Sequence, residues 1–170
     1  MCGICGFTGQ IVDRNETIKN MTDVITHRGP DSDGLFQDDY ISMGFRRLSI
    51  IDLDGGTQPI YNEDKSLVIT FNGEIYNYKI LREQLIKAGH KFYTDTDSEV
   101  LIHGFEEWGE EMLPKLRGMF GFAIYNKNDG SLFIARDFFG IKPMHYTLID
   151  GNLVYGSEIK SILQHPDFKK

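Results

Sequence analysis

The residue with the clearest chemical potential is Cys2, which directly follows Met1. Removal of Met1 would leave one residue that carries both a thiol and a free α-amino group. The reference pKa values of these groups, ~8.5 and ~7.7 to 8.0, lie near neutrality, so the amine could accept the thiol proton directly or through a water. The thiolate could then attack a carbonyl, as a threonine activated by its own terminal amine does. The alternative is that Cys2 is an ordinary small residue near a chain end.

Cys2 and Cys5 also form a C-x-x-C pair, a pattern found in redox dithiols and in half of a zinc site. A thioredoxin-like pair should follow a strand and open a helix, and a structural zinc needs four ligands. This pair lies among glycines at the terminus, and the five histidines show no paired ligand spacing. His90, His103 and His165 carry no signal. We therefore predict no metal site, and we interpret Cys5 as a small buried strand residue.

Three further stretches hold polar residues at positions where chemistry is plausible. Two arginines begin an apolar run, an Asn-Gly-Glu segment follows a predicted strand, and carboxylates stand at a helix start. Taken singly, each stretch has an ordinary explanation: solvated arginines, a turn, and a helix cap. The residues concerned are Arg46, Arg47, Asn72, Gly73, Glu74, Asp97 and Glu99.

The elements that must position these groups include several strands, indicated by apolar alternation and by turn residues between the runs. The Asp150-Gly151 pair predicts a two-residue hairpin. Glycine and proline in H-R-G-P-D predict a fixed loop that extends to residue 34. Strands are expected over residues 2–12, 40–51, 67–71, 120–125, 132–135, 144–149 and 153–155.

Three helices are expected between the strands. The first should begin at Asn15 and end near residue 27, and the second should run from Asn77 to Gly89. The third should begin at the T-x-x-E capping box of residues 96–99. Because hairpins dominate over βαβ crossovers, the pattern predicts an α+β domain with antiparallel sheets and helices on their outer faces.

The composition fits one ordinary globular domain: 170 residues, 41% hydrophobic and 25% charged. The formal net charge of −7 argues against a nucleic-acid partner, which would need clustered Lys and Arg. No stretch approaches the ~20 apolar residues that span a bilayer, so no membrane association is expected. No signal-peptide pattern is present, and we expect a cytoplasmic protein.

The motifs occur in a fixed order: M-C-G-I-x-G at the start, H-R-G-P-D (27–31), R-L-S-I-I-D (47–52), F-N-G-E-I-Y-N (71–77), T-D-S-E (96–99) and A-R-D-x-x-G-I-K-P (135–143). This pattern resembles the class II glutamine amidotransferase domains over essentially the whole chain. Within that group it is most similar to the N-terminal glutaminase domain of glutamine-hydrolysing asparagine synthetases. The resemblance implies one domain over residues 1–170, with the N-terminal-nucleophile hydrolase fold, a four-layer αββα sandwich of two antiparallel sheets.

The resemblance also implies catalytic roles. Cys2, after loss of Met1, would attack the side-chain amide of glutamine and form a thioester. The side-chain amide of Asn72 and the backbone N–H of Gly73 would stabilise the tetrahedral oxyanion. Gly73 has no Cβ, so its backbone could approach the substrate closely. His27 is not expected to act as the base, because the family pattern uses the terminal amine.

Substrate-binding roles follow from the same resemblance. The planar guanidinium of Arg47 suits the α-carboxylate of glutamine. Asp97 is the best candidate for the α-ammonium group, with Glu74 and the Ile51 backbone carbonyl nearby. The substrate would thus be bound by Arg47, Ile51, Asn72, Gly73, Glu74 and Asp97.

The sequence departs from a complete asparagine synthetase because it contains no S-G-G-x-D-S pyrophosphate loop and no P-loop. We therefore expect the C-terminal synthetase domain to be absent from this chain. ATP and Mg²⁺ would serve only that missing domain, and the glutaminase step is expected to need no cofactor. The ammonia would pass to a synthetase domain in cis or in trans, and a homodimer is compatible with the sequence. Two alternatives stay open: a binding module that holds glutamine without turnover, and a dithiol or metal protein.

Overall fold

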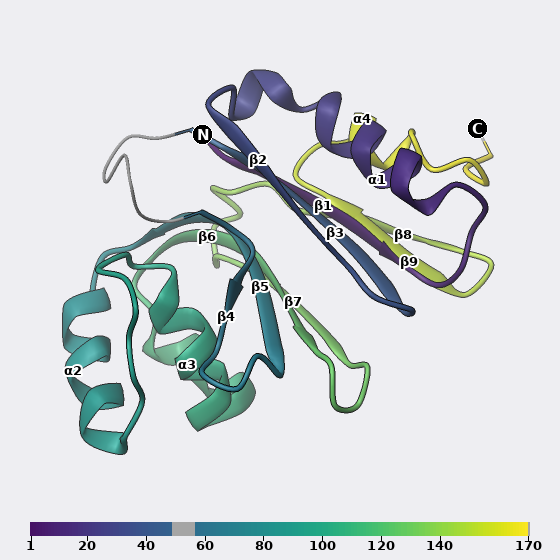
Figure 1. Ribbon diagram of the computed structural model, residues 1–170. Helices are drawn as coiled ribbons and strands as arrows, with labels where there is room; N and C mark the ends of the chain where they lie inside the picture. The colour runs from purple at the N-terminus through teal and green to yellow at the C-terminus, as the bar shows by residue number, and fades with distance from the viewer. Residues whose placement is uncertain (49–56, 170) are drawn as a thin grey trace.

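The structure is a computed structural model, and it describes residues 1–48 and 57–169. Two antiparallel sheets form its centre (Figure 1). The first sheet contains, in spatial order, β2 (Ser32–Gln37), β3 (Ile41–Arg47), β1 (Gly3–Thr8), β9 (Asn152–Gly156) and β8 (His145–Ile149). The second contains β4 (Ile60–Tyr61), β5 (Leu67–Ile75), β6 (Gly118–Asn126) and β7 (Leu132–Arg136).

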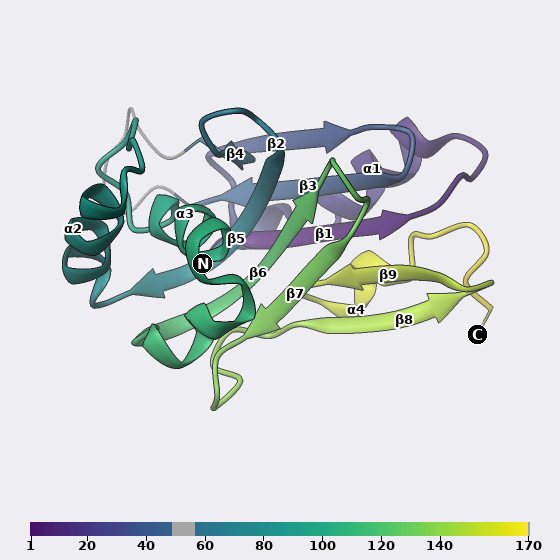
Figure 2. The same cartoon turned by 90° about the horizontal axis from the view of Figure 1, so that it is seen from below.

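Helices cover the outer face of each sheet (Figure 1). On the first sheet lie α1 (Arg14–Asp23) and α4 (Ile159–Ile162), and on the second lie α2 (Tyr78–Ala88) and α3 (Glu99–Trp108). Two 3₁₀ segments, η1 (Thr26–Arg28) and η2 (Gly109–Lys115), follow α1 and α3. The predicted α+β sandwich with four αββα layers is confirmed. Figure 2 shows the strands of the second sheet running obliquely across those of the first.

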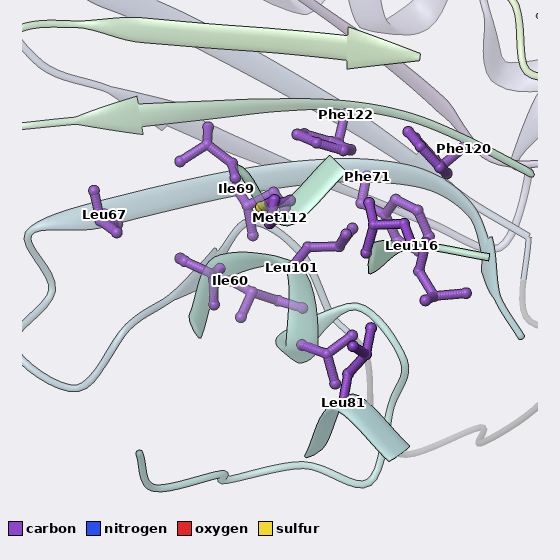
Figure 3. Packing of buried hydrophobic residues seen from close by; sticks show 14 of the residues in the cluster. Ile60, Leu67, Ile69, Phe71, Leu81, Leu101, Met112, Leu116, Phe120 and Phe122 are labelled. Atoms are coloured by element: carbon purple, nitrogen blue, oxygen red, sulfur yellow. The ribbon is translucent and has the colours of Figure 1, made fainter. Parts of the chain in front are cut away.

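The strand alternation produces three buried layers, because successive side chains point to opposite faces of a sheet. In β5, Val68 packs between the two sheets, whereas Ile69 and Phe71 pack under the helices of the second sheet. Figure 3 shows that helix-side layer, in which Leu101 faces the strands. In β1, Cys5 packs toward α1. A third buried cluster thus separates the first sheet from its helices.

Several strand predictions need correction. The loop predicted up to residue 34 is partly strand, because β2 pairs along its whole length with β3. The strand predicted for 67–71 continues to Ile75, and its pairing with β6 runs without a break from Leu67 to Ile75. Asn72 and Gly73 therefore lie inside a strand and form no turn, since long-range pairing outweighs the local turn preference of Asn-Gly. The short β4 and α4 were not predicted.

Two of the three predicted helix starts are also corrected, whereas α2 begins after Asn77 as predicted. Helix α1 begins after Asp13, which has a φ of 57°, so Asn15 lies inside the helix and does not cap it. Helix α3 begins after Ser98, and Glu99 forms no capping box. Its carboxylate accepts hydrogen bonds from the backbone N–H groups of Tyr93 and Thr94, which lie in the preceding segment. Local pattern alone does not reveal such a longer-range partner.

Two turn predictions are confirmed. Asp150 and Gly151 have φ angles of 49° and 82° and join β8 to β9, the positive values that a type I′ hairpin turn requires. Gly89 ends α2 with a φ of 113°. No helix among residues 1–48 and 57–169 is long and apolar enough to cross a membrane.

Candidate active site

Cys2 lies at the start of β1, where this central strand meets the end of β3. Gly3 pairs with Arg46 of β3, and the backbone N–H of Leu48 donates a hydrogen bond of 3.4 Å to Cys2 Sγ. The half-buried Cys2 side chain packs against the apolar cluster between the sheets. The sulfur is therefore held on the face of the first sheet that looks toward the second.

Cys5 occupies the opposite face of β1. Its side chain is fully buried against α1, and its sulfur lies 3.5 Å from Thr22 Oγ1. Burial raises the pKa of the Cys5 thiol to about 11, despite hydrogen bonds from Thr22 and Ser161 that lower it. Because Cys2 and Cys5 face different layers, they are poorly placed to share a metal ion or form a disulfide. This placement argues against the dithiol alternative.

Asn72 projects from β5 into the space between the sheets, on the same strand face as Val68 and Thr70. It is only 2% exposed, and its Nδ2 atom is buried with no hydrogen-bond partner among the described residues. A buried amide donor without a partner is costly for the fold unless a ligand uses it. Asn72 therefore carries a donor that is available for an oxygen atom of a bound substrate.

The residue before Asn72 is fixed by a second amide side chain, which sequence analysis missed. Gln58 donates from Nε2 to the carbonyl oxygen of Phe71 at 3.1 Å, and its Oε1 accepts from the Phe71 N–H at 2.6 Å. Gln58 is buried and acts as a one-residue extension of the sheet beside Phe71. Its position, outside every recognised motif, gave no signal in the sequence.

Gly73 has a structural reason to be glycine that differs from the predicted one. A Cβ at Gly73 would lie 2.2 Å from the carbonyl oxygen of Met119 and 2.8 Å from Phe120 Cα, both on β6. The absence of a side chain is thus demanded by the neighbouring strand. Access of a substrate to the Gly73 backbone was the predicted reason, and that role stays a prediction.

Asp97 is joined to the end of β5 by a hydrogen bond of 2.7 Å from the backbone N–H of Ile75 to Asp97 Oδ2. Burial raises the pKa of Asp97, and the nearby negative charge of Glu74 raises it further, although the Ile75 hydrogen bond opposes both effects. Glu74 itself is exposed. Two carboxylates thus form a locally negative region in which a cation would be stabilised.

The two arginines at the end of β3 differ in their surroundings. Arg46 donates from Nε to the carbonyl oxygen of Thr22 at 3.2 Å and forms an ion pair with Asp23, so it is committed to α1. The next residue, Arg47, is half-buried and by strand alternation points to the opposite face. That face is the one on which Cys2 lies. Ile51, the remaining predicted site residue, falls outside the described residues.

The predicted residues therefore gather at the ends of three strands. Cys2 and Arg47 lie at adjoining ends of β1 and β3, and both strands pack against β5, which carries Asn72 and Gly73. In Figures 1 and 2 the N-terminus lies beside the C-terminal half of β5. Asp97 joins this group through its bond to Ile75. Residues separated by up to 95 positions in the sequence are thus brought to one end of the space between the sheets.

Arg28 is a further site residue that sequence analysis did not single out. Its Nε donates a hydrogen bond of 2.9 Å to the carbonyl oxygen of Cys2, and its guanidinium lies 3.1 Å from Glu158 Oε1. His27 contacts the same carboxylate at 2.8 Å. Although burial alone would raise the pKa of Glu158, hydrogen bonds from His27, Lys160 and Arg28 lower it to about 2. Through Arg28, the H-R-G-P-D loop therefore helps to position the Cys2 backbone.

Asp137, in the A-R-D-x-x-G-I-K-P motif, bonds to backbone groups. Asp137 accepts hydrogen bonds from the backbone N–H groups of Phe120, Ile141 and Lys142. These bonds lower its pKa, although burial acts in the opposite direction. Asp137 thereby shapes the loop between β7 and β8.

The fold and the arrangement at the strand ends define a class of protein, the amidotransferases with an N-terminal-nucleophile hydrolase fold. The chain belongs to the glutamine amidotransferase domain family, whose sequence profile matches residues 1–170. Asparagine synthetase [glutamine-hydrolyzing] 1 of Bacillus subtilis (strain 168) is 51% identical to it over 168 residues, which are 94% of this chain and 27% of that protein. Asparagine synthetase [glutamine-hydrolyzing] 2 of Arabidopsis thaliana is 43% identical over 168 residues, which are 95% of this chain and 28% of that protein.

Solved structures with the same fold are more distant in sequence. The glutamine phosphoribosylpyrophosphate amidotransferase from B. subtilis, complexed with ADP and GMP, superposes with a TM-score of 0.77 at 19% identity, covering 95% of this chain and 43% of that chain. A structure described as the allosteric regulatory enzyme of purine biosynthesis superposes with a TM-score of 0.78 at 20% identity, covering 96% of this chain and 43% of that chain. The chain spans about a quarter of the length of the curated relatives named above.

Proposed function

We propose that this chain hydrolyses the side-chain amide of L-glutamine to glutamate and ammonia through a thioester on Cys2. The observation that carries the proposal is the pairing of a second-position cysteine with a buried, unpartnered amide donor. Cys2 Sγ is held by the Leu48 N–H, and Asn72 Nδ2 projects into the same space between the sheets. A nucleophile and a fixed donor for the developing oxyanion are the two parts that acyl transfer requires.

The proposed reaction proceeds in two halves. The α-amine of Cys2, free after removal of Met1, takes the thiol proton, and the thiolate attacks the amide carbon. Asn72 Nδ2 and the Gly73 N–H stabilise the oxyanion, the C–N bond breaks, and the amine returns a proton to the departing ammonia. Water then attacks the thioester, which releases glutamate and restores the thiol. These steps need no metal or other cofactor.

Substrate selection rests on the two charged ends of glutamine. We assign the α-carboxylate to Arg47, and the α-ammonium to Asp97 with Glu74 and the Ile51 carbonyl. The raised pKa of Asp97 supports this assignment, because a half-buried carboxylate near the negative charge of Glu74 is stabilised when an ammonium group arrives. A compound that lacks one charged end would lose one of these two ion pairs.

We infer that the ammonia is consumed by a synthetase domain, in cis or in trans, and that asparagine synthesis is the reaction served. The curated relatives support this inference, since they are glutamine-hydrolysing asparagine synthetases about four times as long as the matched region. ATP and Mg²⁺ belong to that second domain. We further propose that the chain acts in the cytoplasm and forms a homodimer, which light scattering would detect.

An exposed apolar loop offers a surface for the synthetase domain. Phe138 and Phe139 are 95% and 83% exposed, and Ile141 beside them is also exposed. The backbone on either side of these residues is held by three hydrogen bonds to Asp137, so the fold presents their side chains to solvent. Exposed apolar groups presented in this way are typical of protein interfaces. Lys142, which ends the loop, also contacts Met1 through its Nζ at 3.3 Å from Sδ.

The first experiment is an intact mass of the purified protein before and after treatment with a diazo ketone analogue of glutamine. We expect a mass without Met1 and one adduct on Cys2, which excess glutamine should block. Cys5→Ser is the matched control, because the Cys5 thiol is fully buried and should leave adduct formation unchanged. A protein that retains Met1 and forms no adduct would contradict the proposal and favour a glutamine-binding module.

A further inference from the structure

Four side chains with metal-binding atoms converge on the helix-covered side of the second sheet. Glu63 comes from the turn between β4 and β5, His90 follows α2, and His103 and Glu106 lie on α3. One potential ligand atom from each lies within 4.8 Å of all the others. Only His103 and Glu106 are close in sequence, which explains why histidine spacing alone gave no signal.

The separations between these atoms match those of a small tetrahedral site. His103 Nδ1 lies 3.3 Å from Glu63 Oε2 and 3.8 Å from Glu106 Oε2. His90 Nδ1 lies 3.6 Å from Glu106 Oε2 and 3.5 Å from Glu63 Oε1. Zinc bonds of about 2.0–2.1 Å to nitrogen and oxygen place tetrahedral ligands about 3.3–3.4 Å apart. A cation at the centre would need only small side-chain movements.

Both imidazoles have a carboxylate near the ring nitrogen that faces away from the cluster. His103 Nε2 lies 3.4 Å from Glu99 Oε1, and His90 Nε2 lies 3.3 Å from Glu107 Oε2. Metal-binding histidines almost always have such a partner, which fixes the tautomer and orients the ring. The arrangement leaves Nδ1 of each ring as the atom that faces the other ligands.

The carboxylates are oriented in the same manner. Glu63 Oε1 accepts a hydrogen bond of 2.8 Å from the backbone N–H of Lys91, and Glu106 Oε1 accepts one of 3.3 Å from Asn62 Nδ2. In both residues the Oε2 atom remains directed toward His103. All four side chains thus have an outer partner and an inward-facing atom.

Two of the inward-facing atoms lack hydrogen bonds. His103 is fully buried, and neither its Nδ1 nor Glu63 Oε2 has a hydrogen-bond partner among the described residues. If the cluster were simply an imidazolium ion paired with carboxylates, a directed N–H···O bond would be expected at this 3.3 Å approach. Buried polar atoms that converge without bonding one another are better explained by a cation between them.

We propose that Glu63, His90, His103 and Glu106 form a structural site for a divalent transition-metal cation of the zinc class. Two neutral imidazoles and two carboxylates provide nitrogen and oxygen ligands that suit such a cation, and four protein ligands make the site closed. The cation would join the β4–β5 turn, the segment after α2, and α3. This metal site is separate from Cys2, which lies between the two sheets.

The consequence concerns the segment between α2 and α3. His90 lies near the start of this segment, and Asp97 lies near its end, two residues before α3 begins. Binding of the cation would fix both ends of α3 and the connection that leads to it, through His90, His103 and the Glu99 bond to His103. Metal binding should therefore slow amide hydrogen exchange over residues 89–98, in addition to raising the melting temperature.

The test uses the full chain after removal of metals with EDTA, titrated with Zn²⁺ by calorimetry and with Co²⁺ by visible absorption. We expect about one Zn²⁺ per chain and the intense visible absorption of tetrahedral Co²⁺, with no sulfur-to-cobalt charge-transfer band from Cys2. His90→Gln and Glu106→Gln should each weaken Zn²⁺ binding by at least about 10- to 100-fold, since loss of outer partners alone has such effects. Far-UV circular dichroism checks that both variants fold.

Matched controls are His145→Gln and Glu110→Gln, which change the same residue types outside the cluster and should bind Zn²⁺ as the parent chain does. Equal Zn²⁺ affinity in the parent, His90→Gln and Glu106→Gln would overturn the proposal, as would no binding at 1 mM Zn²⁺. The glutamine-analogue adduct on Cys2 is measured separately on the same samples. Failure of metal binding is thus distinguishable from failure of the proposed glutaminase activity.

Discussion

Asp97 and Ile75 are joined by a hydrogen bond of 2.7 Å between the Asp97 carboxylate and the last backbone N–H of β5. Asn72, with its unpartnered amide donor, lies three residues earlier on the same strand. The carboxylate assigned to the ammonium end of glutamine and the donor assigned to the oxyanion are therefore supported by one element. A shift of β5 would displace both, which couples substrate binding to the chemical step.

The first prediction concerns the charge of Asp97. Asp97→Asn keeps an oxygen that can accept the Ile75 hydrogen bond but removes the negative charge. We expect KM for glutamine to rise about 10- to 100-fold with a much smaller change in kcat, because a hydrogen bond to a charged group contributes about 1.5–3 kcal/mol. Steady-state assays of glutamate release measure both constants. Asp95→Asn is the control, since the Asp95 side chain is 98% exposed; an equal KM increase there would refute the assignment.

The same substitution should stabilise the ligand-free protein. The pKa of Asp97 is raised in the folded state, mainly by burial, so the folded protein binds its proton more tightly than the unfolded chain does. The free energy of unfolding then falls as the pH rises from the unfolded-state pKa of Asp97 through its folded-state pKa. At neutral pH the destabilisation by the ionised carboxylate is fully present. Thermal unfolding should show a higher melting temperature for Asp97→Asn at pH 7 and a smaller gain at pH 3. A loss of stability at pH 7 would contradict this account.

Asn72 should matter for the transition state more than for substrate binding. Asn72→Ala removes the buried donor, and we expect kcat to fall about 10²- to 10³-fold with little change in KM. Asn15→Ala is a suitable control because Asn15 is exposed on α1. Reduced kcat should persist in samples whose circular dichroism and melting curve match the parent. If KM rises while kcat is retained, Asn72 binds the ground state and the oxyanion role is wrong.

The sequence predicts the layers well because strand alternation and the Asp150-Gly151 turn are local signals that the structure keeps. Its errors arise where residues outside the local motif decide the outcome. The Asn72-Gly73 pair looks like a turn, yet uninterrupted pairing with β6 holds it in an extended strand. Glu99 looks like half of a capping box, but its carboxylate binds backbone N–H groups of an earlier segment. In the first example a tertiary contact outweighs local preference, and in the second the carboxylate binds residues five and six positions earlier, beyond the capping-box spacing.

The same distinction applies to the site. Cys2 could be singled out from its position, and the other motif residues from their order along the chain. Arg28 and Gln58 could not, because each acts on backbone atoms of a distant residue, namely the Cys2 carbonyl and the Phe71 peptide groups. No residue pattern encodes such a contact locally. Only the folded arrangement shows that these side chains support the site.

Gln58 provides a prediction about this support. Gln58→Ala would leave both the N–H and the carbonyl oxygen of Phe71 buried without their present partners, and each such group is destabilising by about 1–3 kcal/mol. We expect a loss of roughly 2–4 kcal/mol in the free energy of unfolding, measured with urea. Gln164→Ala removes an exposed glutamine whose amide donates to the carbonyl oxygen of Lys160, and it should change stability little. A Gln58→Ala protein as stable as the parent would show that water replaces the side chain.

The last prediction concerns Glu158, which binds Arg28 while Arg28 binds the Cys2 carbonyl. Burial acts to raise the pKa of Glu158, but its hydrogen bonds with His27, Lys160 and Arg28 lower it from 4.5 to about 2. An acid whose pKa is lower in the folded state stabilises the fold at pH values above its unfolded-state pKa. This contribution is lost as the pH falls from 4.5 to about 2. Glu158→Gln should therefore be less stable than the parent at pH 7, and the difference should shrink toward pH 2.

Because the Glu158 side chain is 26% exposed, we expect the stability difference at pH 7 to be about 1–2 kcal/mol, near the lower end for hydrogen bonds to charged groups. Glu83→Gln, which changes an exposed residue of α2, is the control. The functional readout separates positioning from mere stability. If Glu158 positions Cys2 through Arg28, then Glu158→Gln and Arg28→Lys should both lower kcat several-fold with unchanged KM, even at temperatures where each variant is fully folded. A displaced Cys2 backbone would alter the geometry of nucleophilic attack and so lower kcat. Parent-like kcat in both variants would therefore show that the Arg28–Glu158 pair has only a structural role.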